Sequence, residues 1–447
     1  MENINKRHSV ELIPDKCIGC TDCIKRCPTE AIRVRNSKAT IDENLCIDCG
    51  VCIRVCRNHA KRAVTNSLDV IRDERFKYRV VIPAPSLYSQ FLRNTSINAV
   101  LTALKRIGFD DVLEVSRAAE MITAETVKIL TEEECPKPMI SSACPAVIRL
   151  MAMRFPSLMD NIMPVSAPID VAASAARQMA MRKGYEPDEI GVFFISPCSA
   201  KATAAMYPIG MDKSDVDGVI SIADVYLPLR NIMAKLDPSE YEDLCQRSFE
   251  GMGWAATGGE SADPRIENAI AVDGLENVIR VLEQVEDGQL DDVDFIEANA
   301  CMSGCVGGPL TVINGYVARN ILKKVRQNAA SIPPCRERTV DIPRGSVSLR
   351  LKNRISPANH MRFGQDMGEA IKNMEDIEAI YAELPHIDCG SCGAPNCNAF
   401  AEDVVLDGIP VEDCIFMMRR KVKELAEEMA DLAAKMPQTM TGEKAGN

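Results

Sequence analysis

The chain has 447 residues, which at ordinary domain sizes is enough for two to four domains. Its formal net charge is -12, a balance that does not favour binding to a nucleic-acid backbone or to an anionic membrane surface. No run of about 18 apolar residues is present to cross a membrane, and the polar segment from Met1 to Val10 lacks the apolar stretch of a signal peptide. We therefore expect a cytoplasmic protein that binds neither nucleic acid nor membrane.

The 19 cysteines are the most informative feature of the composition. Disulfide-rich proteins are typically small and secreted. Here most cysteines stand in tight C-x2-C groups that are separated by long stretches without cysteine. In a long chain this pattern is typical of metal ligation, so we interpret the groups as metal ligands.

Two repeated cysteine runs come first, and residues 1–77 are predicted to form a ferredoxin-like α+β domain. Each run has the spacing C-x2-C-x2-C-x3-C, which in two-cluster ferredoxins holds two [4Fe-4S] clusters, with the fourth cysteine of each run ligating the other cluster. A zinc site is the alternative, but zinc sites rarely place three cysteines in one loop of about seven residues. One cluster would use Cys17, Cys20, Cys23 and Cys56, and the other Cys46, Cys49, Cys52 and Cys27.

From Tyr78 onward, short apolar runs alternate with helical patterns, and we place a second domain at residues 78–370. Strands are predicted at 79–83, 112–115 and 190–195, and helices at 97–107, 118–131 and 167–182. This alternation indicates parallel sheets in an α/β architecture. In such folds, functional residues gather in the loops at the carboxyl ends of the strands.

Three such loops contain cysteine. They read Ser-Ser-Ala-Cys-Pro at 141–145, Ser-Pro-Cys-Ser-Ala-Lys at 196–201, and Glu-Ala-Asn-Ala-Cys-Met-Ser-Gly-Cys-Val-Gly-Gly-Pro at 297–309. A single cysteine at the end of a strand is often only a small buried apolar residue. Together the loops supply four thiolates from separate segments, the number that one further cubane cluster requires.

In order and spacing these loops resemble the three signature motifs of the FeFe hydrogenases, which are TSCCP, MPCxxK and ExMxCxxGCxxGG. The likeness covers roughly residues 1–330, since that family also commonly carries a two-cluster ferredoxin module. It implies two lobes with parallel sheets and an active site between them. That site would contain an H-cluster, a [4Fe-4S] cluster joined to a diiron unit with carbon monoxide, cyanide and azadithiolate ligands. Its protein ligands would be Cys144, Cys198, Cys301 and Cys305.

The same resemblance assigns roles to residues beside the ligands. Cys305 would bridge to the diiron unit, and Pro197 would lie next to that unit. Lys201 would donate a charge-assisted hydrogen bond to a cyanide, although an ordinary surface lysine is the alternative. Glycines at 304, 307 and 308 would let the backbone approach the cluster closely. Residues 253–259 are a looser match to a glycine-rich segment of the family, with a turn-rich loop as the alternative.

The chain departs from the catalytic pattern at the proton relay. Catalytic members place a cysteine just before the first ligand, where this chain has Ala143, which cannot carry a proton. Because acid–base groups typically contribute about 100- to 10,000-fold to a rate, we expect slow turnover, which suits a sensor better than a bulk catalyst. A route through water and the polar replacements is the alternative. The other changed positions are Thr126, Ile129 and Met163 in the relay, with Glu125 beside it, and Ser196 and Asn299 in place of motif methionines.

A last set of cysteines predicts a third accessory [4Fe-4S] cluster in a small domain at residues 371–420, with zinc as the alternative. The segment is similar to an iron–sulfur domain of corrinoid iron–sulfur proteins and of sensory-type hydrogenases, a domain that catalytic members generally lack. The four ligands would be Cys389, Cys392, Cys397 and Cys414. Cys135, Cys245 and Cys335 are not at metal-ligand spacing, and we expect no metal role for them.

Residues 421–447 are predicted to form an amphipathic helix and a disordered tail from Met440 to Asn447. Apolar side chains recur at helical spacing at Leu425, Met429, Leu432 and Met436. This face would pack on the body of the protein, pair with a second copy in a homodimer, or begin a linker to a signalling domain. No PAS or kinase-like domain follows, so we expect output through a redox or signalling partner.

The sequence therefore predicts an oxygen-sensitive, sensory-type FeFe hydrogenase with an H-cluster and three accessory [4Fe-4S] clusters. Hydrogen would be slowly interconverted with protons and electrons, and the redox state would pass along the clusters to the partner. Hydrogenase maturation proteins would load the site. Two alternatives stay open: a catalytic subunit of a larger electron-transfer complex, and an electron carrier or assembly factor without the diiron unit.

Overall fold

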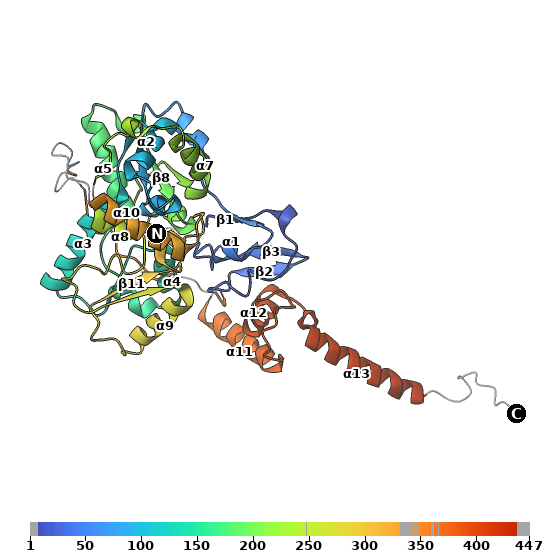
Figure 1. The fold of residues 1–447 in the computed structure, drawn as a ribbon. Helices are drawn as coiled ribbons and strands as arrows, with labels where there is room; N and C mark the ends of the chain where they lie inside the picture. The colour runs from blue at the N-terminus through green and yellow to red at the C-terminus, as the bar shows by residue number, and fades with distance from the viewer. Residues whose placement is uncertain are drawn as a thin grey trace. The chain divides into compact units, whose positions relative to one another are not determined.

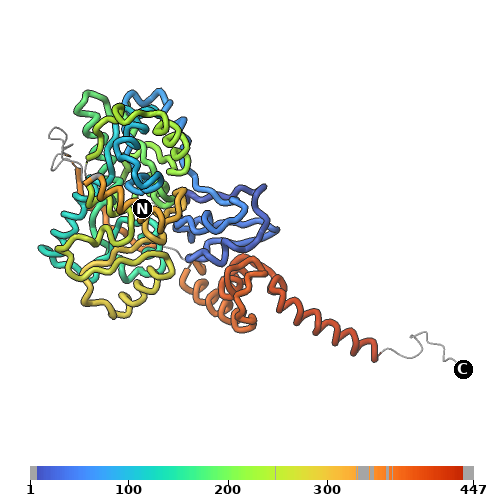
Figure 2. Tube along the Cα trace, in the orientation of Figure 1, coloured from blue at the N-terminus to red at the C-terminus, as the bar shows by residue number. Residues whose placement is uncertain are grey.

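The computed structural model describes residues 8–246, 248–330, 342, 347–358, 362–364 and 366–435. The chain divides into two compact units (Figure 1). The larger unit consists of residues 1–13 and 42–358, and the smaller unit of residues 14–41 and 359–447. Figure 2 traces the path of the chain through both. The domain boundaries predicted at 77, 370 and 420 remain predictions.

A four-stranded parallel sheet forms one lobe of the larger unit. Its order is β6 (Asp111–Val112), β5 (Tyr78–Pro83), β8 (Ile190–Ser196) and β9 (Gly218–Ser221). Every residue of β8 is buried, as expected of a parallel strand that is covered on both faces.

Helices cover both faces of this sheet because alternate side chains of its strands point to opposite sides. Val192 and Phe194 pack into the apolar core that includes α3 (Val115–Glu132) and α5 (Pro168–Arg182). Phe193 and Ile195 pack on the other side, against α2 (Ile97–Ile107) and α7 (Ile222–Met233).

A three-stranded parallel sheet forms the second lobe, in the order β10 (Ala269–Asp273), β11 (Phe295–Asn299) and β7 (Met139–Ile140). Its apolar core includes side chains of α4 (Pro145–Arg154) and α9 (Leu275–Glu286). The expected α/β architecture with two parallel sheets is therefore confirmed.

The predicted elements agree with the structure except at one strand. The helix at 97–107 has the bounds of α2, and those at 118–131 and 167–182 lie within or at the edge of α3 and α5. The strand predicted at 112–115 is wrong beyond Val112. Val115 instead begins α3, because Glu114 takes an extended conformation as the N-cap and a long helical pattern follows it.

Shorter elements complete the larger unit. β1 (Val10–Leu12) pairs antiparallel with β4 (Lys61–Ala63). The remaining helices are α1 (Val51–Val55), α6 (Ser199–Met206), α8 (Phe249–Gly253) and α10 (Gly315–Ala330), with 3-10 turns at Leu68–Arg72, Pro85–Gln90, Pro156–Asn161, Pro187–Glu189, Pro238–Glu240 and Gly304–Gly307.

The described residues of the smaller unit combine a two-stranded hairpin with three helices. β2 (Ile32–Arg35) pairs antiparallel with β3 (Lys38–Ile41). Arg33 and Arg35 of β2 form ion pairs of 2.8 and 2.6 Å with the buried Asp403 of α12. The helices are α11 (Met367–Glu383), α12 (Cys397–Asp407) and α13 (Ile415–Ala434), with 3-10 turns at Pro14–Lys16 and Val411–Asp413.

Helix α13 begins at Ile415, before the start of the amphipathic helix predicted from residue 421, and it extends beyond α11 and α12 as a single helix (Figure 1). Met436, the tail from Met440 and Cys335 lie outside the described residues. In the described part of the chain, no helix combines the length and the apolar character that a membrane crossing needs.

Candidate functional site

The three cysteine loops of the larger unit all follow the carboxyl ends of parallel strands. Cys144 follows β7 and is the N-cap of α4. Cys198 follows β8 and is the N-cap of α6. Cys301 follows β11, and Cys305 lies in the next 3-10 turn, Gly304–Gly307. One loop therefore comes from the first sheet and two come from the second.

Lys201, in the first turn of α6, contacts the other two cysteine loops. Its ammonium group donates a hydrogen bond to the Ala143 carbonyl at 3.2 Å and lies 3.8 Å from the Cys305 sulfur. Burial lowers the pKa of Lys201, but the nearby thiols of Cys305, Cys198, Cys144 and Cys301 together raise it above its usual value. All four sulfurs are thus within electrostatic reach of a single cation.

The thiols lie in a poorly solvated environment. Burial raises the pKa of Cys198 to about 12, and it also raises the pKa values of Cys301 and Cys305. None of the four forms a disulfide bond. Without metal the thiols of Cys198, Cys301 and Cys305 would stay protonated at neutral pH, so metal binding must displace their protons. Four converging sulfurs with the half-buried cation of Lys201 beside them fit an anionic cluster that needs four thiolate ligands.

The cysteines of the described residues do not form a compact site for a single metal ion. No three His, Cys, Asp or Glu side chains of the described residues gather closely enough to hold a single metal ion. In a cubane each thiolate binds a different iron atom, so its ligands stand farther apart than the ligands of one ion.

Two glycines let the cysteine loops pack against each other. A Cβ at Gly308 would lie 2.3 Å from the carbonyl oxygen of Pro197. A Cβ at Gly304, whose φ is +81°, would lie 2.7 Å from the backbone nitrogen of Thr257. Glycine at these positions keeps the Cys305 loop in direct contact with the Cys198 loop and with the glycine-rich segment.

The structure places apolar side chains at most of the expected relay positions. Ile129 and Met163 are buried, and the hydroxyl of the buried Thr126 has no hydrogen-bond partner among the described residues. Glu125 accepts a hydrogen bond from Arg350 at 2.7 Å. Glu125 is therefore held in an ion pair with Arg350.

The two polar replacements of motif methionines are hydrogen-bonded locally. The Ser196 hydroxyl donates to the Cys198 carbonyl at 2.8 Å and accepts from the Cys198 amide at 3.2 Å. The Asn299 amide group donates to Glu297 at 3.0 Å. Both side chains therefore support the ligand loops, and Asn299 belongs to a second polar group.

That second group was not predicted from the sequence. Glu260, which is buried, accepts a hydrogen bond from Ser141 at 2.6 Å, and Ser141 accepts one from the Ala143 amide. Burial, with the nearby charge of Glu297, raises the pKa of Glu260 to about 8. Glu297 accepts bonds from Asn299 and from the backbone of residues 258–261. The only sequence signal was position: Glu260 directly follows the glycine-rich segment 253–259.

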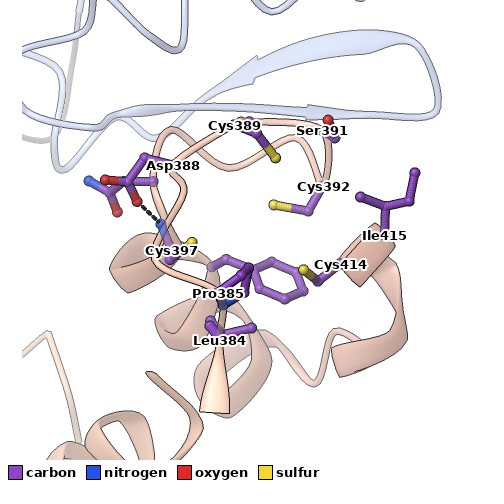
Figure 3. A pocket seen from close by; sticks show the side chains of 12 residues that line it. Leu384, Pro385, Asp388, Cys389, Ser391, Cys392, Cys397, Cys414 and Ile415 are labelled. Atoms are coloured by element: carbon purple, nitrogen blue, oxygen red, sulfur yellow. Dashed lines mark hydrogen bonds between the residues drawn. The ribbon is translucent and has the colours of Figure 1, made fainter. Parts of the chain in front are cut away.

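The C-terminal cysteines line one pocket of the smaller unit, where their sulfur atoms face a common space (Figure 3). Apolar side chains such as Leu384 and Phe400 line the same pocket. Asp388 accepts a hydrogen bond from the Cys397 amide at 2.8 Å, and Arg35 donates to the Cys392 carbonyl. The structure thus brings together Cys389, Cys392, Cys397 and Cys414, none of which forms a disulfide.

The eight ferredoxin cysteines are divided between the units. The first run lies in the smaller unit and the second run, from Cys46 to Cys56, lies in the larger one. Within the larger unit, Cys49 packs against the same apolar core as Cys144 and Cys198. The second run therefore adjoins the central site, while the shared ligation of the two clusters remains a prediction.

Comparison with known families matches all three cysteine regions. A model of the "Iron only hydrogenase large subunit, C-terminal domain" matches residues 77–263 and 229–309, which together are just over half of the chain. A "4Fe-4S dicluster domain" model matches residues 9–57, and an Fe-S cluster model matches residues 384–416.

Curated relatives include two hydrogenases. The chain is 26% identical over 256 residues to iron hydrogenase 1 of Clostridium pasteurianum, covering 47% of this chain and 44% of the relative. It is 26% identical over 282 residues to the periplasmic [Fe] hydrogenase large subunit of Nitratidesulfovibrio vulgaris, covering 57% of this chain and 66% of the relative. The chain thus spans less than two thirds of the length of either relative.

Similar solved structures include a variant [FeFe]-hydrogenase of Chlamydomonas reinhardtii. The sequence identity is 19%, the TM-score is 0.44, and the match covers 59% of this chain and 87% of that one.

Proposed function

The chain belongs to the iron-only (FeFe) hydrogenase family, and from that membership we propose that it is a sensory hydrogenase. In this proposal the four central cysteines hold an H-cluster, at which hydrogen is slowly interconverted with protons and electrons. When bound, the H-cluster supplies the iron site at which hydrogen is split or formed. The chain supplies the ligands, one positioning cation and the surroundings that limit proton exchange.

The observation that carries the proposal is the position of Lys201 among the four sulfurs. A buried ammonium group is costly unless an anion lies next to it. The ammonium group of Lys201 lies 3.8 Å from the Cys305 sulfur. Lys201 is therefore suited to hydrogen-bond an anionic ligand beside Cys305, which a chain that held only an ordinary cubane would not require.

Slow turnover follows from the residues around Ala143. Its methyl group can neither donate nor accept a proton, and its backbone groups are already bonded to Lys201 and Ser141. Glu260 is a buried acid that is linked to the Ala143 amide through Ser141, and its pKa of about 8 keeps it protonated at neutral pH. We propose that this pair supports a low residual rate of proton exchange.

The accessory clusters would carry the redox state away from the H-cluster. The loop that contains Cys46 and Cys49 adjoins the central site, and the C-terminal cysteines provide a further cluster beside α13. A redox or signalling partner would read that state, and maturation proteins would insert the diiron unit.

Helix α13 is suited to pair with a second copy of the chain, and we propose a homodimer there. Its exposed apolar side chains are spaced alternately by three and four residues, a pattern typical of a coiled-coil seam. If two copies of α13 packed antiparallel, the apolar side chains of one helix would lie opposite those of the other. Lys421 would then face Glu428 of the partner subunit, which pairs opposite charges. The seam residues, 37 to 71% exposed, are Ile415, Met418, Val422, Leu425, Met429 and Leu432.

Hydrogen evolution by the matured full chain, measured per loaded active site, tests the sensory function. We expect a rate at least about 100-fold below that of a catalytic relative matured in the same way, because an acid–base group typically contributes that much. An equal rate would instead support the alternative of a catalytic subunit in a larger electron-transfer complex.

A further inference from the structure

A buried ion pair joins the second ferredoxin loop to the central site. Asp48 stands between Cys46 and Cys49, and its carboxylate accepts a hydrogen bond from Arg149 of α4 at 2.6 Å. Each residue is only 1% exposed. A pair this deeply buried must be fully hydrogen-bonded to be tolerated, so the partners of both side chains are informative.

Asp48 is fully engaged, and its partners come from the helices that carry the central ligands. Its carboxylate also accepts from Thr203 of α6 at 2.8 Å and from the Ser9 amide at 2.7 Å. Its backbone carbonyl accepts from Ser199 of α6 at 2.8 Å. Since Cys198 is the N-cap of α6 and Cys144 is the N-cap of α4, one residue of the ferredoxin loop is fastened to both ligand-bearing helices.

The same loop also touches the Cys305 segment. A Cβ at Gly50, whose φ is +71°, would lie 2.4 Å from Cγ of Pro309. The loop that follows Cys49 therefore packs directly on the end of the third motif. Asp48 and Gly50 together fix the second ferredoxin loop against all three loops of the central site.

Arg149, in contrast, is only partly engaged. One terminal nitrogen binds Asp48, but Nε and Nη2 are buried and have no hydrogen-bond partner among the described residues. Buried guanidinium donors require acceptors. Cys49 packs against a larger apolar core that also contains Ile148 and Leu150, the neighbours of Arg149 in α4. A [4Fe-4S] cluster with four thiolates is an anion. The sulfur atoms of a cluster at Cys49 could therefore accept hydrogen bonds from the positively charged guanidinium group.

We propose that Arg149 is a positioning residue for the cluster that Cys46, Cys49 and Cys52 are predicted to hold, and that Asp48 fixes its orientation. Its free N–H groups hydrogen-bond the sulfur atoms of that cluster and raise its reduction potential. Hydrogen bonds to sulfur and nearby charge are two of the properties that set such potentials. The pair would therefore favour electron transfer from the H-cluster to this cluster, an inference that rests on the proposed function.

The test is an EPR-monitored redox titration of the full chain with its accessory clusters but without the diiron unit. Arg149→Met, combined with Asp48→Asn so that no buried charge is left unpaired, should lower the midpoint potential of one cluster. We expect the equilibrium for its reduction to fall at least tenfold, which is about 59 mV for a one-electron couple. The other clusters should keep their potentials and so serve as internal controls.

A second pair of variants separates hydrogen bonding from folding. Arg149→Lys keeps the charge with a different donor geometry and should lower the same potential by less. Arg177→Met removes another partly buried arginine of the larger unit, one that pairs with Asp217 at 2.5 Å, and should shift no potential. If the double variant does not assemble its clusters, the midpoint potential measured for Arg149→Lys tests the proposal in its place.

Unchanged potentials in variants that retain their cluster content would overturn the inference. An unshifted Arg149→Lys protein would do so as well. Neither result would affect the proposed hydrogenase function, because the titration does not involve the diiron unit. A wild-type chain that never shows reducible clusters would instead remove the basis of the proposed function itself.

Discussion

At the residue before the first ligand of the central site, this chain has an alanine, and the proposed slow turnover depends on it. Ala143 lies next to Cys144, and its carbonyl contacts the ammonium group of Lys201. The side chain of Ala143 is a methyl group, which carries no proton. In the proposed function this side chain limits proton exchange, and Ile129 and Met163 at the other expected relay positions are buried and apolar.

Restoring the thiol should restore proton transfer. Ala143→Cys is expected to raise hydrogen evolution by about 100-fold, the lower range of what a positioned acid–base group contributes. The measurement is the rate per loaded active site in the matured protein. Ser142→Cys is the matched control, because it introduces a thiol one position away, where the native hydroxyl bonds the Val165 carbonyl.

An unchanged rate in Ala143→Cys would show that the limiting step lies elsewhere. The next positions would then be Thr126 and Met163, since both are buried and neither carries an acid.

At the level of elements, the site depends on how closely the loops after β8 and β11 approach each other. Gly308 lies against the carbonyl of Pro197, and the Leu310 amide donates to that same carbonyl at 2.9 Å. The strands fix where the loops begin, and these contacts fix how far apart Cys198 and Cys305 stand. A side chain at Gly308 would need space that the backbone does not provide.

Gly308→Ala is therefore expected to separate the two loops and to lower the iron content of the central site. Its Cβ would have to displace a backbone oxygen 2.3 Å away. Gly368→Ala is the control, because a Cβ there meets only a side-chain oxygen of Asp366 at 3.3 Å in the first turn of α11. Iron analysis of both reconstituted variants makes the comparison, and equal iron content would contradict this account of the loops.

Much of this arrangement was predictable from the sequence. Buried parallel strands show as apolar runs, and cysteines that follow them are expected at one edge of a sheet. The 97–107 helix was predicted with its observed bounds because its apolar face has a clear helical period. Val112–Val115 was misassigned because a short β-branched run does not show where a strand ends and a helix begins.

Contacts between distant segments were not predictable. The bond from Ser141 to Glu260 spans 119 residues, and the pair of Asp48 and Arg149 spans 101. Neither contact is marked in the sequence by a characteristic spacing or a periodic pattern. Each depends on how two distant segments meet in the folded chain. Buried polar networks of this kind are visible only when the tertiary structure is known.

At the scale of the whole molecule, the proposed dimer through α13 can be tested separately from the chemistry. Leu425→Glu places a charge in the middle of the apolar seam and should convert a dimer to a monomer, as light scattering during size-exclusion chromatography would show. Ala430→Glu, outside the seam, should leave the mass unchanged. A wild-type chain that is monomeric at micromolar concentration would contradict the proposed pairing.

The account as a whole depends on four sulfurs and Lys201 forming a site for an H-cluster. Infrared spectroscopy of the full chain after maturation tests this most directly, because carbon monoxide and cyanide bound to iron give stretching bands that no amino acid produces. We predict such bands, a shift of them when hydrogen is added, and their loss in Lys201→Met with the accessory clusters retained. A matured chain that contains its [4Fe-4S] clusters but shows no such bands would contradict the account.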